Sequence, residues 1–325
     1  MADDLGVVYT DKRLSDLEKA LRRVYAQAEE EIGKKIDKFT QRTAELEEKK
    51  LAKVKAGTMT QDEFDAWKRG RAFYGEEWKR QRAEVANVLA KANETALKMI
   101  RGEQYDVFGF NSNYAAYDIE HGFGVNFDFK LYDKKTIERL LMKDPDILPF
   151  KRLDKIKDAR WNFKNIKSQI SQGILQGDSI PEIARRLASV VPNRNEKQMV
   201  LHARTAMTAA QNGGRLERYK EAEELGIKMK KVWIATLDGR TRDLHADLDG
   251  QAVGIDEDFE IDGFAVQYPG DPWGEPEMVY NCRCTMATEL EDYPAQFSRR
   301  AKNEDGSYEI ISNMTYREWQ KSKGG

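Results

Sequence analysis

The residues best suited to chemistry gather in one stretch of this sequence. The chain has only two cysteines, Cys282 and Cys284, which flank one arginine in the sequence NCRC, and His245 is one of its three histidines. Residues two apart in an extended segment point to the same side, so both thiolates could bind one metal ion. With His245 as a third ligand and Asp243 or Asp247 as a fourth, the set predicts a zinc site.

A second interpretation of the same residues needs no metal. Cysteine is often a small buried residue, so Cys282 and Cys284 could simply close a hydrophobic core. The pattern also lacks the doubled CxxC spacing of many zinc sites. Two cysteines one residue apart do not form an ordinary disulfide framework, so synthesis in a reducing compartment is expected.

The elements that must position these residues include a helix beginning near Glu196. It presents Arg204, Thr208 and Asn212 at intervals of four residues, which places them in a line on one helix face. Small alanines beside this line would let another backbone approach closely. We therefore expect the line to be a structural anchor for the following strand and loop, with a solvent-exposed face as the alternative.

A small antiparallel sheet is expected after that helix. Residues 230–237 (KKVWIATL) are rich in β-branched and aromatic side chains, as strands are, and Asp238-Gly239 is a turn signal. Further along, FEI and FAVQY would form an acidic β-hairpin around an Asp262-Gly263 turn.

The N-terminal third predicts long charged helices. Apolar residues recur at helical spacing over 11–56, and further helices are expected at 60–68 and 76–101. These helices could form a bundle or an arm that docks on a larger assembly. Residues 106–150 are rich in aromatic residues and glycine, so short helices and loops are expected there, with the rings in a core or, alternatively, stacked on nucleic-acid bases.

Composition narrows the function classes. Lysine and arginine (54) nearly balance aspartate and glutamate (56), so the net charge does not favour DNA or membranes, and an electrostatic partner must meet a local patch. No apolar run reaches the roughly 20 residues of a membrane span. The first residues lack the basic and apolar regions of a signal peptide, so a soluble protein is expected.

At this point the residues resemble a known family. The order ART…N, VW.AT.DGRTR..H..LDGQ, an acidic loop rich in proline and glycine, and NCRC is similar to the phage head morphogenesis (Mu protein F-like) family over residues 155–291. The charged N-terminal helices and the sequence MTYREW at 314–319 also resemble minor head proteins of tailed phages. One departure concerns the ligands: many members carry two cysteines where this chain has Arg242 and His245, and a histidine where it has Val279-Tyr280.

The resemblance implies a fold and a domain order. We expect a predominantly helical α+β protein with a helical arm or bundle (1–105), an aromatic and glycine-rich connector (106–150), a head morphogenesis domain with a small antiparallel sheet (151–291) and a C-terminal tail (292–325). The tail carries enough apolar residues to dock on its own domain or on a partner.

The resemblance also implies a function. The chain would be a minor head protein made in the host cytoplasm and kept in the virion, in the capsid interior. It would act in procapsid assembly, bound to the portal protein, scaffold or major capsid protein, with a role in DNA packaging or ejection. A local basic cluster is compatible with weak, non-specific contact with double-stranded DNA. Its members are Lys228, Lys230, Lys231, Arg240 and Arg242.

Two rival functions remain open. An ADP-ribosyltransferase-like or toxin-related enzyme could use Arg204 with Glu275 or Glu277, but no strand of the type such sites need appears in the sequence. Nor does a nucleophile elbow, a P-loop or an HExxH sequence occur. A dedicated DNA-binding module would need a localised basic face, whereas the most distinctive loop is acidic. We therefore expect a structural protein and no enzyme.

Overall fold

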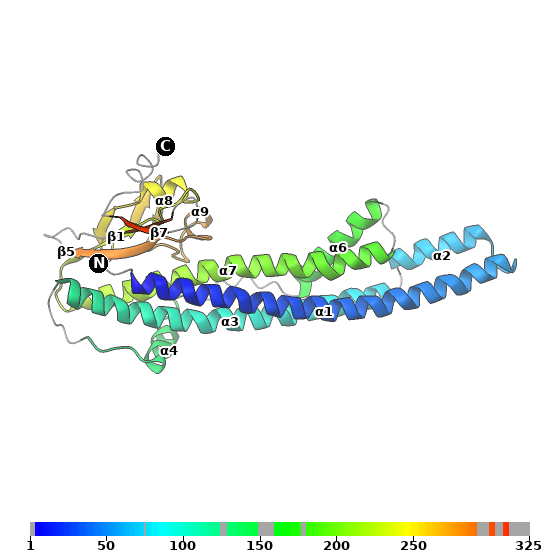
Figure 1. Cartoon of the computed structure of the whole chain (residues 1–325), viewed down its shortest axis with the longest axis horizontal. Helices are drawn as coiled ribbons and strands as arrows, with labels where there is room; N and C mark the ends of the chain where they lie inside the picture. The colour runs from blue at the N-terminus through cyan, green and yellow to red at the C-terminus, as the bar shows by residue number, and fades with distance from the viewer. Residues whose placement is uncertain are drawn as a thin grey trace. The chain divides into compact units, whose positions relative to one another are not determined.

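The computed structural model describes residues 4–74, 76–123, 129–148, 159–176, 180–290, 299–302 and 308–311. The protein is predominantly helical, with long helices followed by a small antiparallel sheet, as predicted (Figure 1). Its helices are α1 (Leu5–Lys55), α2 (Gln61–Tyr74), α3 (Glu76–Phe123), α4 (Lys134–Lys143), α6 (Ala159–Leu175), α7 (Ile180–Glu224), α8 (Asp243–Asp247) and α9 (Pro276–Val279). Its strands are β1 (Met229–Ile234), β2 (Ala252–Gly254), β3 (Phe259–Ile261), β4 (Phe264–Val266), β5 (Thr285–Leu290), β6 (Arg299–Lys302) and β7 (Tyr308–Ile311). Among these described helices none is long and apolar enough to span a membrane.

The chain divides into two compact units, each built from separate stretches of sequence. The first unit contains residues 1–18, 99–155 and 201–325, and the second contains 19–98 and 156–200. These units differ from the contiguous segments expected from composition because α1, α3 and α7 each contribute to both. Whether the expected segments fold separately stays a prediction.

In the second unit, the amphipathic pattern of α1 buries its apolar stripe within the same chain. Leu21, Ile32 and Phe39 of this stripe are buried. A buried polar chain also crosses the unit: the Tyr25 hydroxyl donates to Asn93 Oδ1 (2.6 Å), and Asn93 Nδ2 donates to Asn195 Oδ1 (3.0 Å). A buried hydrogen bond is directional, so this chain fixes the register in which these helices pack.

Helix α3 is longer than the sequence predicted. It was expected to end near Arg101, with short helices and loops after it, but it continues through the aromatic residues to Phe123. Tertiary packing explains the difference, because this stretch buries Val107, Phe108 and Ile119. Gly109 lies within this helix at the point where Ile137 of α4 packs against it. A Cβ at this position would lie 2.1 Å from Cδ1 of Ile137, so only glycine leaves room for that side chain.

Helix α7 also overrides a predicted break. A helix was expected to begin near Glu196, after Pro192, yet the helix runs without interruption from Ile180 to Glu224. An interior proline costs a helix about 3 kcal/mol, so the surrounding contacts must outweigh that cost. Just past the proline, buried Asn195 donates to the carbonyl of Val191 (2.9 Å) while its Oδ1 accepts from Asn93.

The small sheet has the order β2-β1-β5, with both pairs antiparallel. Strand β1 is central and places Trp233 opposite Met286 of β5, both fully buried. The predicted hairpin is confirmed as β3 and β4, whose turn residues Asp262 and Gly263 have φ values of 48° and 82°. Such left-handed values suit an Asp-Gly turn between twisted strands.

The core of the first unit lies between this sheet, the C-terminal half of α7 and the end of α3. Its buried members include Ile119, Leu216, Tyr219, Trp233, Leu248, Phe259, Met278, Cys282, Cys284 and Met286. The cysteines therefore belong to a hydrophobic core as well as to the group of possible metal ligands.

Candidate metal centre

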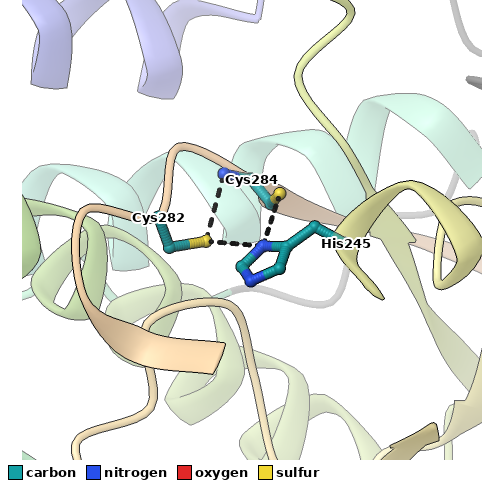
Figure 2. A group of neighbouring side chains, drawn as sticks. All are labelled: His245, Cys282 and Cys284. Atoms are coloured by element: carbon teal, nitrogen blue, oxygen red, sulfur yellow. Dashed lines mark hydrogen bonds between the residues drawn. The ribbon is translucent and has the colours of Figure 1, made fainter. Parts of the chain in front are cut away.

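His245, Cys282 and Cys284 meet in the structure, and we call them the His-Cys-Cys cluster (Figure 2). Their ligand atoms all lie within 4.8 Å of one another. His245 Nδ1 is 3.4 Å from Cys284 Sγ and 3.5 Å from Cys282 Sγ. The three side chains are only 2–3 % exposed. Chemically, the cluster offers two sulfurs and one nitrogen, the donor types of a zinc site.

Helix α8 brings the histidine to the cysteines. This single turn of helix begins after Arg242, and the His245 ring lies edge-on against Trp233 with ring centroids 5.6 Å apart. Arg242 contacts the ring nitrogen that faces away from the cysteines: its guanidinium lies 3.0 Å from His245 Nε2. The same guanidinium donates to the carbonyl of Tyr280 (3.0 Å).

The two aspartates expected as a fourth ligand lie elsewhere. Asp243 and Asp247 are both exposed, and neither belongs to the group of ligand atoms around His245. Helical geometry gives the reason, because residues two apart on a helix point about 200° away from each other. The choice of Asp243 or Asp247 is therefore wrong for this arrangement.

Side chains hold the last three carbonyls of the cysteine turn, which we define as residues 281–284. Thr208 donates to the carbonyl of Cys282 (2.7 Å), and Asn212 Nδ2 donates to that of Cys284 (3.1 Å). The carbonyl between them, of Arg283, accepts from Thr236 at 2.7 Å. The bonds to Cys282 and Cys284 are buried, where carbonyls need partners, so these donors fix the path of the turn and hence the directions of both sulfurs.

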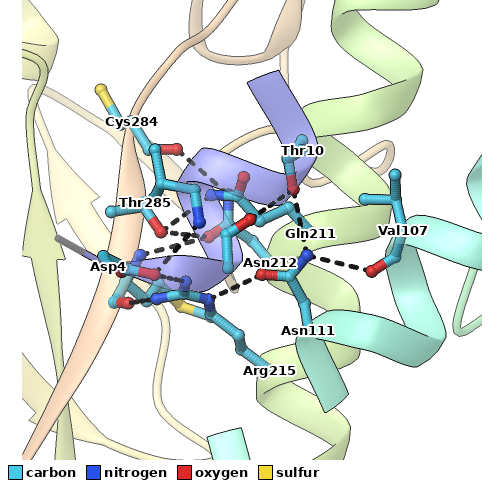
Figure 3. Close-up of polar contacts among 12 residues, drawn as sticks. Asp4, Thr10, Val107, Asn111, Gln211, Asn212, Arg215, Cys284 and Thr285 are labelled. Carbon is cyan, nitrogen blue, oxygen red and sulfur yellow. Dashed lines mark hydrogen bonds and ion pairs between the residues drawn. The ribbon is translucent and has the colours of Figure 1, made fainter. Parts of the chain in front are cut away.

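Thr208 and Asn212 belong to a longer set of side chains on one face of the helix, which we call the α7 polar stripe. Figure 3 labels Gln211, Asn212 and Arg215 of this set. Its members are Thr205, Thr208, Gln211, Asn212 and Arg215. Each contacts the chain between residues 281 and 286: besides the bonds above, Thr205 Oγ1 accepts from the N–H of Asn281, Gln211 donates to Thr285, and Asn212 Oδ1 accepts from the N–H of Met286. The stripe therefore fastens the cysteine turn and the start of β5 to α7.

Arg204 does not take the role expected from its spacing. It was grouped with Thr208 and Asn212 as an anchor for the following strand, but its guanidinium pairs with Glu18 of α1 at 2.8 Å. The neighbouring Thr205 takes the position on the stripe instead. A face of a helix repeats every three or four residues, and a strict four-residue interval misses members at the three-residue step.

Arg215 ends the stripe and was not among the residues predicted from sequence to anchor the strand. It is 3 % exposed, and it donates to Asp4 Oδ1 (2.6 Å), the carbonyl of Met286 (2.7 Å) and Asn111 Oδ1 (3.3 Å), as Figure 3 shows. Burial alone would lower the pKa of Arg215, but the charges of Asp4 and Asp118 outweigh it and raise the pKa. The guanidinium therefore stays charged and links the first residues of α1 to β5.

A second ion pair holds the other side of the turn. Arg283, which lies between the cysteines and so points away from them, contacts both carboxylate oxygens of Asp238, one of them at 2.8 Å. Burial acts to raise the pKa of Asp238, but the hydrogen bonds from Arg283 and from the Arg240 N–H prevail and lower it to about 2. Paired, planar contacts of this kind are the stronger form of arginine–carboxylate bond.

The two thiols have different acidities. Burial acts to raise the pKa of Cys282, but hydrogen bonds from the thiol and N–H of Cys284 and the charges of Arg242 and Arg283 lower it below its ordinary value. Burial raises the pKa of Cys284 well above that value, and its hydrogen bond with Cys282 acts in the same direction. Without a metal, Cys282 is therefore the first of the two to ionise.

Comparison with known proteins finds a family that is similar to the part of the chain containing this site. Residues 164–287 match the model of the Phage Mu protein F like protein family. Over 327 aligned residues the chain is 27 % identical to the Minor head protein GP7 of Bacillus phage SPP1, covering 97 % of this chain and 95 % of that protein.

Two further relatives share only part of their length with this chain. One is an NAD(+)–arginine ADP-ribosyltransferase of Enterococcus faecalis, 34 % identical over 169 residues, which are 52 % of this chain and 33 % of that protein. The other is the uncharacterized protein YqbB of Bacillus subtilis, 28 % identical over 153 residues, 46 % of this chain and 48 % of that protein. No solved structure matches the chain.

Proposed function

We propose that this chain, whose residues 164–287 belong to the Phage Mu protein F like family, is a minor head protein of a tailed phage. The observation that carries the proposal is the extent of the similarity to the SPP1 minor head protein, which covers 97 % of this chain. The similarity therefore includes the long helices that precede the family domain as well as the domain itself.

The geometry of the His-Cys-Cys cluster favours a structural role over catalysis. All three side chains are buried, and the backbone of the cysteine turn is held at three carbonyls. A substrate could reach these groups only if the stripe and the turn separated. A site of this kind suits a domain whose task is to keep its shape within an assembly.

In finer terms, we propose that the protein acts in procapsid assembly, at the portal or on the inner capsid surface, and stays in the virion. Its partners would be the portal protein, scaffold or major capsid protein. A role in DNA packaging or ejection would bring it close to DNA. The basic cluster expected from sequence supports only weak DNA contact, since Lys231 is fully buried and cannot reach a phosphate.

The test is complementation of a phage whose copy of this gene carries a nonsense codon. Particles made without the protein, with the wild-type chain and with an Arg215→Ala variant would be purified and analysed by mass spectrometry and by infectivity. We expect the wild-type protein in the particles and a loss of infectious particles without it. The matched control for Arg215→Ala is Gln198→Ala, which changes an exposed residue of the same helix, α7. Normal infectious particles that lack the protein would rule the proposal out.

Two further experiments address the finer roles. Co-purification with a tagged portal ring should retain the wild-type chain, and a clean separation of the two would remove the portal from the list of partners. A gel-shift series with duplex DNA at rising salt should show weak binding that salt abolishes. No shift even at low salt would remove the DNA role.

An enzymatic function is the second candidate because one relative is named an ADP-ribosyltransferase. The chain spans only 33 % of that protein, so the shared part need not carry its activity. Arg204, the arginine nominated for such a site, is engaged with Glu18. Incubation with labelled NAD and an arginine-rich acceptor should transfer no label.

A further inference from the structure

We infer that His245 Nδ1, Cys282 Sγ and Cys284 Sγ bind one Zn²⁺ ion, which joins α8 to the cysteine turn. The inference goes beyond the head function proposed above and does not depend on it. It rests on where three donor atoms lie, on how they are held, and on what surrounds them.

The first observation is the distance between the donors. In a tetrahedral site with Zn–S of about 2.3 Å and Zn–N of about 2.0–2.1 Å, nitrogen and sulfur ligands lie about 3.5 Å apart. His245 Nδ1 lies 3.4 Å from one sulfur and 3.5 Å from the other. Both nitrogen–sulfur distances therefore match those around a shared zinc ion, and all three ligand atoms lie within 4.8 Å of one another.

The second observation separates a metal site from a simple hydrogen bond. One imidazole N–H points along one direction and can make one good hydrogen bond, which would draw one sulfur closer than the other. Here the nitrogen is nearly equidistant from two sulfurs, both aimed at it from the same side of the turn (Figure 2). A single ion between three ligands accounts for this arrangement directly.

The third observation is that the ligands are pre-positioned. The carbonyls of Cys282 and Cys284 are held by Thr208 and Asn212, and the His245 ring packs against Trp233. Little conformational entropy remains to be lost when the ion binds. The carbonyl of Glu277, 3.4 Å from His245 Nε2, offers the outer hydrogen bond that metal-bound histidines usually make.

Binding moves protons in a defined way. In the arrangement without metal, the Arg242 guanidinium can only donate, so Nε2 accepts and the ring proton sits on Nδ1. When Nδ1 binds zinc, the ring proton moves to Nε2 and is donated to the Glu277 carbonyl. Nη2 of Arg242, also a donor, must then turn away from Nε2, while Nη1 keeps its bond to the Tyr280 carbonyl. Both cysteines bind as thiolates and release their protons to solvent. Since the described residues supply three ligands, a water molecule completes the four.

The experiment measures metal on the purified full-length protein. After removal of metal by a chelator and dialysis against Zn²⁺, we expect one zinc per chain in the wild type and in Asp247→Asn, which changes the exposed carboxylate that the site does not use. His245→Ala and Cys284→Ser should lose at least nine-tenths of the bound zinc. Retention of full zinc by either of these two variants would overturn the inference.

A second measurement covers the case in which those variants fail to fold. X-ray absorption at the zinc edge of the wild-type protein should show two sulfur scatterers among four ligands. Substitution by Co²⁺ should give a sulfur-to-cobalt charge-transfer band and the intense visible bands of a tetrahedral ion. A spectrum with only oxygen and nitrogen ligands, or a wild-type protein that binds no zinc, would show that the cluster is a hydrogen-bonded core and not a metal site.

Discussion

Arg283 lies between two cysteines, and this position decides what each of the three side chains can reach. Alternation along an extended segment turns both sulfurs toward His245 and the guanidinium toward Asp238. The NCRC sequence therefore carries two sets of contacts on opposite sides of one short turn. A change at Asp238 should act on the second set and leave the first in place.

We expect Asp238→Asn to lower the free energy of unfolding by about 2 kcal/mol at pH 7, because hydrogen bonds between a buried carboxylate and a charged guanidinium are worth roughly that much. The folded pKa of about 2 lies below the ordinary value of 3.8, so the ionised carboxylate stabilises the fold above pH 4. That stabilisation is lost as the pH falls from about 4 to 2. Denaturant titrations of both proteins across this range should converge at low pH. Curves that stay parallel would contradict the ion pair.

Lys231 gives a pH dependence of the opposite kind. Its ammonium is buried, donates to the carbonyl of Ile255 (2.9 Å) and lies 5.4 Å from the ring centre of Phe259. Burial outweighs the attraction of Asp258 and lowers the pKa of Lys231 from 10.5 to about 8. The unfolded chain therefore binds more protons than the folded one between pH 8 and 10.5, and stability rises with pH across that window.

Comparison with Lys231→Met isolates the contribution of Lys231 to the pH dependence of stability, since methionine keeps much of the apolar part of the lysine side chain without its charge. The free energy of unfolding of the wild type minus that of the variant should increase from pH 8 to pH 10.5. Denaturant titrations at several pH values would measure it, with Lys230→Met as a control for removing a lysine from β1. A difference that is flat over this range would show that Lys231 is not buried as a charged group.

At the scale of elements, α7 is the helix on which the site is built. Its polar stripe bonds to residues 281–286, and Arg215 at its end also bonds to Asp4. The Asn212 side chain by itself makes three hydrogen bonds to other segments: it donates to the carbonyls of Pro269 and Cys284 and accepts from the N–H of Met286. Its loss would leave several buried polar groups without partners.

Asn212→Leu should therefore lower the free energy of unfolding by roughly 3 kcal/mol, because each unsatisfied buried group costs about 1–3 kcal/mol. Gln198→Ala, at an exposed position on the same helix, should change it by less than about 0.5 kcal/mol. Thermal and denaturant unfolding of the three proteins would test this. Equal stabilities of Asn212→Leu and wild type would mean that the stripe does not hold the turn.

The close approach of α3 and α7 is a second property of the elements. A Cβ on Gly214 would lie 2.4 Å from the backbone oxygen of Phe108, so one helix would have to move. Gly214→Ala should cost about 3 kcal/mol through overpacking. The matched control is Gly102→Ala in α3, where a Cβ meets nothing within 4 Å and alanine should stabilise the helix by about 0.5–1 kcal/mol. Opposite signs in thermal melts are the expected result.

Sequence patterns recovered the elements better than their contacts. Helical spacing, the Asp-Gly turn signal and the strand around Trp233 were sufficient because each depends on residues close in the chain. The continuations of α3 past Gly109 and of α7 past Pro192 were missed, because they depend on contacts with residues outside each helix, Ile137 for α3 and Asn93 for α7. Arg215 was missed for the same reason: its partners Asp4 and Met286 lie far away in sequence.

For the whole molecule, the proposed zinc ion makes stability depend on solution conditions. A ligand that binds only the folded state adds about 1.4 kcal/mol for each tenfold rise of its free concentration above Kd. The melting temperature should therefore rise with free Zn²⁺ and fall when a chelator is added. Mg²⁺ at the same concentrations is the control, since it prefers oxygen ligands. A melting temperature that ignores zinc would contradict a metal bound to the native state.

The ion pair between Asp4 and Arg215 joins residues 211 positions apart, and Arg215 in turn bonds to Met286 of β5. During translation the first turn of α1 leaves the ribosome long before its partners exist. Asp4, Arg215 and β5 all belong to the first unit, so that unit can be completed only once synthesis has passed residue 290. Contacts between residues so far apart in sequence slow folding. A nascent chain that stalls or is cut before residue 290 would therefore leave that unit unfinished.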